Sequence, residues 1–302
     1  MTTYNLKAIE NRKIFLSIAA ILVIVSVGSI AFFGFKQGID FTGGSLWRFK
    51  VQDSADLSKI ESVLKKDLAI SDVHLTSVGS DSSIIARLPV IDQATHDKGI
   101  LLLQASLPGF VELSFQSIGP SVGAELRKNA LLAVFFVLLG ISLYVAFAFR
   151  KVSRPISSWK YGVVTLVSLF HDVIVPAGLL AFLGYSQGIE IDSNFVVALL
   201  VIAGFSVHDT IVVFDRIREN LILQRGKSEF SDIINDSVNQ TAVRSVNTSL
   251  TLIFVLITLL FLGPVTLQYF IGTLLLGTVI GVYSSIFVAS PLLLVWHRFG
   301  QK

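Results

Sequence analysis

Residues 195–214, FVVALLVIAGFSVHDTIVVF, are almost entirely apolar and have the length of a helix that crosses a bilayer. One carboxylate interrupts the run, since Asp209 lies about seven residues, or roughly 10 Å, from its charged end. An aspartate at mid-membrane costs roughly 2.5–3.5 kcal/mol on insertion scales, and one that persists there usually moves a proton or an ion. The stretch therefore predicts a transmembrane helix with an ion-coupling carboxylate.

The composition of the whole chain indicates the same environment. Hydrophobic residues make up 53% of its 302 residues and charged residues 15%, whereas soluble domains carry about 25% charge. The net charge of +3 comes from basic residues beside apolar segments, which is typical of membrane topology rather than of nucleic-acid binding. The chain has no cysteine and no Walker, zincin or nucleophile-elbow motif, so we expect neither an enzyme nor a bound metal or organic cofactor.

Six segments reach the length of about 20 apolar residues that a membrane-crossing helix needs: residues 14–35, 126–149, 159–183, 195–214, 243–262 and 267–296. The first is too long for a cleaved signal peptide and no Ala-x-Ala site follows it, so we expect a retained anchor. We expect a polytopic α-helical membrane protein in three parts. These are residues 1–36 with the first span, a domain at residues 37–125, and a bundle of five spans at residues 126–302.

The orientation of these spans follows from the basic residues in the short loops. Residues 184–192 and 263–266 contain no Lys or Arg, whereas the loops after the second and fourth spans and the C-terminus are basic. The basic positions are Arg150, Lys151, Arg154, Lys160, Arg216, Arg218, Arg225, Lys227, Arg298 and Lys302. The asymmetry predicts that both termini lie in the cytoplasm and that residues 37–125 are extracytoplasmic.

Residues 37–125 have the pattern of a small α+β domain. Alternating runs predict strands at residues 45–51, 73–78, 83–90 and 111–118, with a turn at Gly79-Ser80-Asp81. Helical periodicity predicts helices at residues 56–68 and 92–107, with Asp92 as the expected N-cap. The order β-α-β-β-α-β is the ferredoxin-like arrangement, which by itself does not identify a ligand.

Arg244 begins the fifth span and is the expected partner of Asp209. It shares a helix face with Asn247, Thr248 and Thr251, which follow at i+3, i+4 and i+7. A cation beside Asp209 favours the charged carboxylate and burial favours the protonated one, so a group between these influences can load and release a proton. The alternative is a fixed ion pair that holds two helices together.

Two histidine–aspartate pairs lie inside predicted spans. His208 either shares the proton of Asp209 or is a neutral histidine bonded between helices. His171 and Asp172 fall near the middle of the third span, one turn before Pro176. Asp172 is a second candidate proton site, with a hinge or a satisfied polar contact as alternatives. Protons are the expected coupling ion, and sodium remains an alternative because a carboxylate beside hydroxyl groups can bind either.

Glycines mark the joints of the predicted domain. Residues 38–44 and 119–126 are glycine-rich, and neither has a nucleotide-binding context, so they predict tight turns that join membrane helices to the domain. Gly277 and Gly281 have the small-xxx-small spacing that lets helices approach closely.

Several of these motifs occur in the order found in one family. Residues 38–44, 119–126, 206–220 and 244–250, together with Phe170-His171-Asp172, resemble the SecD/SecF family of protein-export membrane proteins, and its SecF branch in particular. That family belongs to the RND superfamily of proton-driven transporters. The resemblance implies that Asp209 and Arg244 pass protons. It also places Asn where this chain has His208, so His208 either tunes local proton chemistry or substitutes as a polar neighbour.

The resemblance further implies partners and a location. The implied partners are SecD as a heterodimer, the SecYEG channel, the unfolded polypeptide in transit, membrane lipid, and YajC and YidC as further candidates. The location is the bacterial inner membrane, where the proton-motive force helps to draw secreted chains outward. Two other classes are an RND-type exporter of small molecules or lipids, which needs a substrate cavity within the spans, and a non-transporting scaffold. Six spans with one outer domain are typical of half a pseudo-symmetric transporter, which favours obligate pairing.

Overall fold

The computed structural model describes residues 6–51, 57–78, 83–150, 156–224 and 228–299. The chain divides into two compact units, one formed by residues 1–36 and 131–302 and the other by residues 37–130. Some predicted features lie outside the described residues: the turn Gly79-Ser80-Asp81, the start of the helix at Asp56, and the basic residues Lys151, Arg154, Arg225, Lys227 and Lys302.

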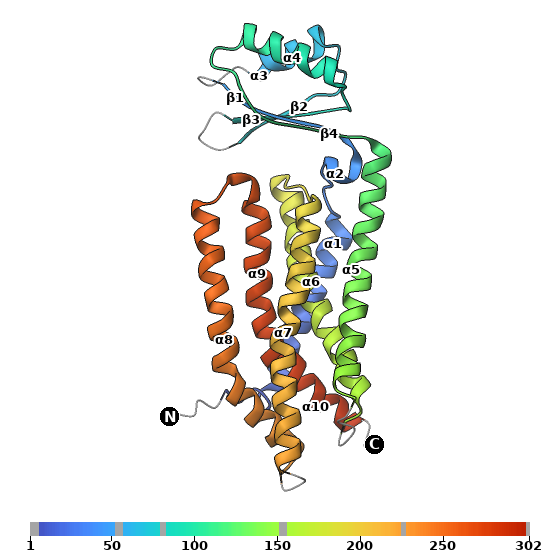
Figure 1. The fold of residues 1–302 in the computed structure, drawn as a ribbon, viewed down its shortest axis with the longest axis vertical. Helices are drawn as coiled ribbons and strands as arrows, with labels where there is room; N and C mark the ends of the chain where they lie inside the picture. Colours follow the sequence, from blue (N-terminus) through green and yellow to red (C-terminus); the bar gives the residue numbers. More distant parts are fainter. Residues whose placement is uncertain (1–5, 52–56, 79–82, 151–155, 225–227, 300–302) are drawn as a thin grey trace. The chain divides into compact units, whose positions relative to one another are not determined.

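In the described part of the chain, six helices are long and apolar enough to cross a membrane, which confirms the predicted number of spans (Figure 1). They are α1 (Arg12–Phe33), α5 (Pro120–Ala148), α6 (Ser158–Gln187), α7 (Ser193–Gln224), α8 (Phe230–Leu262) and a last span, Val265–Arg298. The last span contains α9 (Gln268–Ser284), a π-helical turn (Ser285–Ala289) and α10 (Ser290–Phe299). Both α7 and α8 extend beyond their apolar runs, because buried residues such as Ile217 and Ile234 continue one helical face among polar neighbours.

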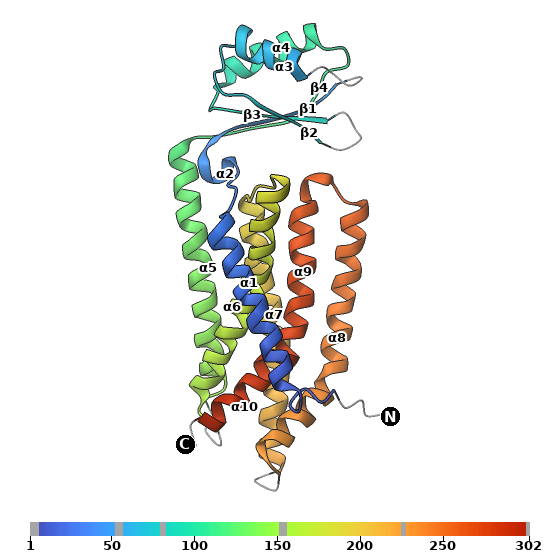
Figure 2. The same ribbon diagram turned by 180° about the vertical axis from the view of Figure 1, so that it is seen from behind.

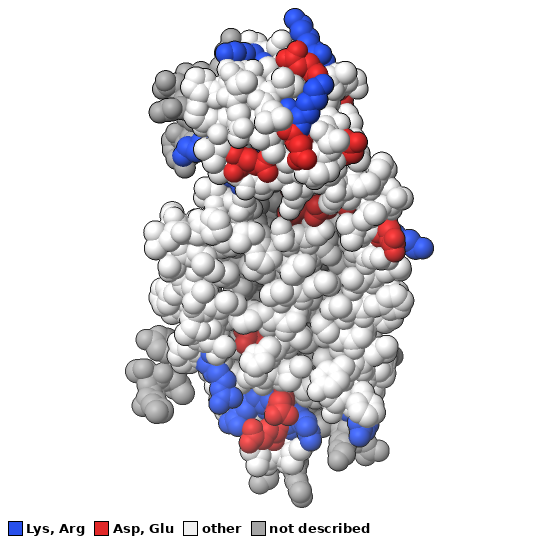
Figure 3. Space-filling view, turned by 45° about the horizontal axis from the view of Figure 1, so that its top comes forward, with Lys and Arg blue, Asp and Glu red and all other residues white. Residues whose placement is uncertain are grey.

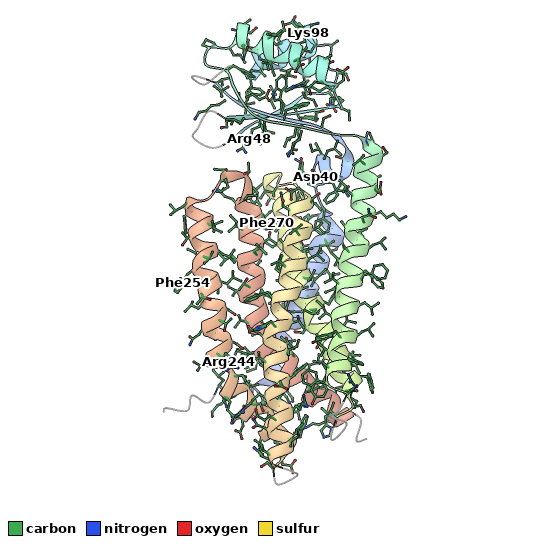
Figure 4. The ribbon with its side chains drawn as sticks, viewed as in Figure 1. Asp40, Arg48, Lys98, Arg244, Phe254 and Phe270 are labelled. Atoms are coloured by element: carbon green, nitrogen blue, oxygen red, sulfur yellow. The ribbon has the colours of Figure 1, made fainter. Side chains whose placement is uncertain are left out.

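Three spans form the interior of the helical unit. In the most apolar part of each helix, 61% of α6, 50% of α7 and 61% of the last span is buried, against 11% of α1 and α5 and 17% of α8. The helix α6 packs on α1, α7 and α9, and α9 packs on α6, α7 and α8 (Figures 1 and 2). The outer helices expose large apolar side chains, and Phe254 of α8 points away from the other helices (Figure 4). These faces suit lipid or a partner helix.

Charged side chains are unevenly distributed over the surface of the helical unit. On the face in Figure 3, a broad band of the helical surface is nearly free of charged side chains, and Lys, Arg, Asp and Glu gather at its end. Hydrocarbon accepts an uncharged band and excludes such charges, so this surface fits a bilayer.

Small residues allow the closest helix contacts. A Cβ added at Gly178 of α6 would lie 2.4 Å from the Cβ of Ser26 of α1, and one at Gly281 of α9 would lie 3.1 Å from the Cβ of Ser206 of α7. Gly277, one turn earlier on α9, also faces α7. The close approach expected from the small-xxx-small spacing is thus confirmed.

Among its described residues, the smaller unit contains a four-stranded sheet, two helices that pack on the sheet, a short helix before the first strand and the start of α5. Its elements are β1 (Gly44–Lys50), α3 (Leu57–Ser62) with a π-helical turn (Val63–Asp67), β2 (His74–Val78), β3 (Ser83–Leu88), α4 (Gln93–Ser106) and β4 (Val111–Ile118). The strand order is β2-β3-β1-β4, and every neighbouring pair is antiparallel. The helices α3 and α4 cover one face of the sheet (Figures 1 and 2).

Strand alternation explains which face the helices cover. Trp47 and Phe49 of β1 are fully buried together with Leu103 of α4, whereas Arg48 lies between them on the other face. The helix α4 begins as predicted, because Asp92 accepts a hydrogen bond from the backbone N–H of Thr95 at 2.9 Å. That bond lowers the pKa of the Asp92 carboxyl.

The two glycine-rich stretches meet in this smaller unit. The short helix α2 (Ile39–Thr42) ends at Gly43, whose φ of 76° and ψ of 170° belong to a region open mainly to glycine. A Cβ at Gly43 would lie 2.8 Å from the Cα of Pro120, and one at Gly123 would lie 2.9 Å from the backbone nitrogen of Gly43. Backbone therefore packs directly on backbone where the segment before β1 meets the start of α5.

Candidate functional site

Asp209 lies on the packed face of α7. This helix buries Ser206, Asp209, Thr210 and Val213 at three- and four-residue spacing, and it packs on α8 and α9. Asp209 is only 2% exposed, and its Oδ2 accepts a hydrogen bond from Ser249 Oγ of α8 at 3.2 Å. Protein rather than lipid therefore surrounds this carboxylate, as an intramembrane charge requires.

His208 touches the same carboxylate from a different direction. Its Nδ1 lies 3.7 Å from Asp209 Oδ1, yet the His208 side chain is 65% exposed and that of Asp209 is 3% exposed. Successive residues of a helix are turned by about 100°, so His208 faces outward from the chain while Asp209 faces inward. The imidazole therefore lies between the buried carboxylate and the outer surface of the chain.

Arg244 is exposed and lines one edge of a polar pocket formed by residues of α7 and α8. The pocket has a volume of about 370 Å³ and is lined by Val212, Asp215, Arg216, Glu219, Gln240, Thr241 and Arg244. Figure 4 labels Arg244 on α8. Val212 is one helical turn from Asp209, so the pocket ends one turn from the buried carboxylate.

No ion pair joins Arg244 to Asp209 among the described residues. Ser245 and Ser249, four residues apart, are the buried positions of α8 in this region, and Arg244 is turned by about 100° from Ser245. The predicted pairing is therefore absent from this conformation of the chain, and it remains a prediction for another conformation.

The predicted polar face of α8 points away from the chain. Asn247, Thr248 and Thr251 are exposed, as is Arg244. Thr248 Oγ1 donates to the carbonyl of Arg244 at 2.9 Å, and Thr251 Oγ1 donates to that of Thr248 at 2.7 Å. These hydroxyls satisfy backbone carbonyls of their own helix. The face is a polar strip on the outer surface of an apolar span.

The second predicted carboxylate, Asp172 of α6, is fully buried and bonded to three elements of the unit. Its Oδ2 accepts hydrogen bonds from Ser206 Oγ of α7 and from Ser284 Oγ of α9, the latter at 2.7 Å. Its Oδ1 lies 2.8 Å from His171 Nδ1, and His171 is 2% exposed. The fold thus brings together side chains far apart in sequence around one carboxylate.

Sequence reasoning missed the hydroxyl groups that donate hydrogen bonds to Asp172 and to Asp209. Ser206 lies in an apolar run, Ser249 follows Thr248 and Ser284 precedes Ser285, and the sequence offers no signal that separates these serines from other hydroxyl residues. Most such hydroxyls bond the carbonyl one turn earlier, as Ser237 and Thr241 do here. Among the described residues, no group of three or more His, Asp or Glu side chains is placed to hold a metal ion.

Six apolar spans with two carboxylates buried between them define a polytopic membrane protein of the transport class. A family model described as protein export membrane protein SecD/SecF, C-terminal, matches residues 102–299, and a model of the SecD/SecF GG motif matches residues 28–55. The chain belongs to the SecD/SecF family of protein export membrane proteins.

Similar proteins agree with this assignment. A protein translocase subunit SecF from Thermobaculum terrenum is 42% identical over 95% of this chain and 92% of its own length. Another from Anaerolinea thermophila is 36% identical over 97% of this chain and 94% of its own. The crystal structure of SecDF from Thermus thermophilus, described as a translocon-associated membrane protein, is 30% identical with a TM-score of 0.83. That match covers 99% of this chain and 40% of the SecDF chain.

Proposed function

We propose that this chain is a SecF-type subunit of the protein-export machinery and that it works as a heterodimer with SecD. Its relatives support this function, since the two similar chains described above are named protein translocase subunit SecF. SecDF combines both names in a single polypeptide, of which this chain matches only 40%. The exposed apolar faces of α1, α5 and α8 provide surface for a partner of this kind.

The proposed topology places both termini in the cytoplasm and residues 37–125 outside, as a ferredoxin-like domain between the first and second spans. The basic loops support this orientation. The antiparallel order β2-β3-β1-β4 supports the domain type. In this topology the pocket that holds Arg244 opens toward the cytoplasm, and the domain meets the emerging polypeptide near SecYEG, with YajC and YidC as further candidate partners.

Asp209 is the proposed carrier of the proton, and its buried contact with Ser249 is the single observation that supports this role most directly. A carboxylate between helices changes its hydrogen bonding when it gains or loses a proton, and the helices repack in response. Arg244 is turned by about 100° from the buried Ser245, so a rotation of α8 of that order turns its guanidinium toward Asp209. The pocket beside Arg244 supplies the water from which protons come or to which they go.

The energy available per proton sets how the cycle works. One charge that moves down about 100 mV releases about 2.3 kcal/mol, which biases a two-state equilibrium about 50-fold. That bias suffices to switch a helix arrangement, whereas moving a long polypeptide requires many cycles. Each cycle would shift the grip of the outer domain on the emerging chain through the glycine-rich joints.

The test is export into proteoliposomes that hold SecYEG and SecD with this chain. An imposed pH gradient should stimulate export with the native chain, and Asp209→Asn should abolish that stimulation while leaving insertion and binding to SecD intact. Asp236→Asn is the matched control, because it neutralises an exposed carboxylate on the neighbouring helix α8 that does not line the pocket beside Arg244. The control should retain stimulation.

Two further outcomes separate the alternatives. Stimulation by a sodium gradient but not by a pH gradient would replace the proton by sodium at Asp209. Full stimulation by the pH gradient in Asp209→Asn would exclude Asp209 as the carrier and leave the chain as a scaffold in this process.

A further inference from the structure

The cluster around Asp172 is separate from Asp209 and has its own set of contacts. Asp172 is fully buried, and two hydroxyl groups and one imidazole surround its two oxygens. The hydroxyls come from Ser206 of α7 and Ser284 of α9, so the carboxylate connects three of the central helices. Its hydrogen bonds therefore link α6 to α7 and to α9.

Two polar atoms beside this cluster could each form a further hydrogen bond. His171 Nε2 and Ser168 Oγ have no hydrogen-bond partner among the described residues, although these residues are 2% and 1% exposed. Ser168 precedes Asp172 by four residues on α6, so both lie on the same face of that helix. A buried polar atom without a partner costs about 1–3 kcal/mol, so a cluster that served only to join helices would be expected to satisfy both.

The charge of the cluster depends on a single proton. The bonds described for Asp172 come from Ser206, Ser284 and His171, and none of these side chains is Lys or Arg. The titratable groups on the elements packed against α6 are Arg12 and Lys13 at the start of α1, His208, Asp209 and the charged end of α7, Tyr269 and Tyr283 of α9, and His297 and Arg298 of α10. Tyr283 has its ring 6.2 Å from that of His171, and its hydroxyl donates to the carbonyl of Phe15.

With a neutral imidazole and an ionised carboxylate, the pair of His171 and Asp172 carries one negative charge, and one additional proton makes the pair neutral. Hydrocarbon surroundings oppose a net charge. Two hydroxyl donors, together with the imidazole in the tautomer that carries its proton on Nδ1, support one. These two effects act in opposite directions on the charge of the pair.

We propose that His171 and Asp172 form a second proton-binding site of this chain, an inference that rests on the proposed proton-coupled function. The proton arrives at the lone pair of His171 Nε2. The proton on His171 Nδ1 passes to Asp172 Oδ1, so the imidazole remains neutral with its proton on Nε2 and the carboxylate becomes a carboxylic acid. Release runs through the same two bonds in reverse.

Ser206 connects this site to the helix that carries Asp209. Asp209 follows Ser206 by three residues on α7, so the two contacts lie one turn apart. On the same helix Thr210 Oγ1 lies 2.9 Å from Ser285 Oγ, the first residue of the π-helical turn in the last span. Protonation weakens Asp172 as an acceptor for Ser206 and Ser284, and the change reaches α7 and a helix segment already distorted at this point.

The test is infrared difference spectroscopy of the full chain in lipid nanodiscs, with pH changed in steps over the range in which the chain stays folded. A carboxylic acid C=O band should appear as pH falls and disappear as pH rises, and Asp172→Asn should remove that band. Ser284→Ala should move the band to higher frequency, because the C=O group loses a hydrogen bond. Ser290→Ala is the matched control, since Ser290 is buried in the same span and donates to the carbonyl of Ser285 instead.

Three results would overturn the proposal. The first is that the C=O band that shifts in Ser284→Ala does not respond to pH, which is the behaviour of a purely structural carboxyl group. The second is that Asp172→Asn leaves every pH-dependent band in place, and the third is that the band responds to sodium at constant pH but not to pH. The band should survive in Asp209→Asn, so a failure of Asp209 in the export assay and a failure of this second site are distinguishable.

Discussion

Replacing Gly43 with alanine should destabilise the smaller unit by about 2–6 kcal/mol. The backbone angles of Gly43, φ 76° and ψ 170°, cost a residue with a Cβ about 1–3 kcal/mol. The new Cβ would also lie 2.8 Å from the Cα and 2.9 Å from the nitrogen of Pro120, and overpacking of this kind costs about 1–3 kcal/mol. Both atoms belong to the backbone, so no flexible side chain can move aside.

Two neighbouring glycines separate the contributions to this cost. At Gly123 the added Cβ would meet backbone at 2.9 Å without an unusual φ, and alanine in a helix regains about 1 kcal/mol over glycine. At Gly119 nothing lies within 4 Å and φ is ordinary. The loss of stability should therefore be largest for Gly43→Ala, smaller for Gly123→Ala and within about 0.5 kcal/mol of zero for Gly119→Ala.

The fluorescence of Trp47 provides the assay. The chain has 3 tryptophans, and Trp47 is fully buried in the core of the smaller unit. With Trp159 and Trp296 replaced by phenylalanine, urea unfolding of the full chain in nanodiscs reports the free energy of unfolding of that unit. Equal stability of Gly43→Ala and Gly119→Ala would refute the argument that backbone packing at this joint requires glycine.

Two further predictions concern packing and pH. Gly178→Ala should destabilise the helical unit by about 1–3 kcal/mol in thermal unfolding in detergent, because the added Cβ would lie 2.4 Å from the Cβ of Ser26. Gly204→Ala is the control and should cause no such loss, because nothing lies within 4 Å of its added Cβ. Equal losses of stability in the two variants would contradict the importance of the contact between Gly178 and Ser26. Asp92→Ala should destabilise the smaller unit near neutral pH, because the bond from Thr95 lowers the pKa of Asp92. A group whose pKa is lowered in the folded state stabilises that state above its unfolded pKa of about 3.9, and this contribution is lost as pH falls through the folded pKa. In urea unfolding, the difference in free energy of unfolding between the native chain and Asp92→Ala should therefore shrink in acid. A difference that stays constant with pH would exclude the charge of Asp92 as its cause.

Much of the architecture follows from local pattern. The six spans need only length and apolarity, and the strands and helices of the smaller unit need only alternation and an N-cap such as Asp92. The ends of α7 and α8 were missed, because buried side chains among charged ones continue those helices past the apolar run. A hydropathy reading averages over all faces of a helix, so it cannot detect a continuation carried by one face.

The candidate site divides in a similar way. The sequence determines that Asp172 and Asp209 lie inside spans, because a carboxylate in an apolar run is costly in hydrocarbon and therefore rare. Tertiary structure alone decides their partners: Ser249 rather than Arg244 bonds Asp209, and Ser206 and Ser284 bond Asp172. Successive side chains of a helix point in directions about 100° apart, so neighbouring residues contact different surroundings. Packing across the whole bundle sets which face of a helix meets another helix, and this choice cannot be made from one helix alone.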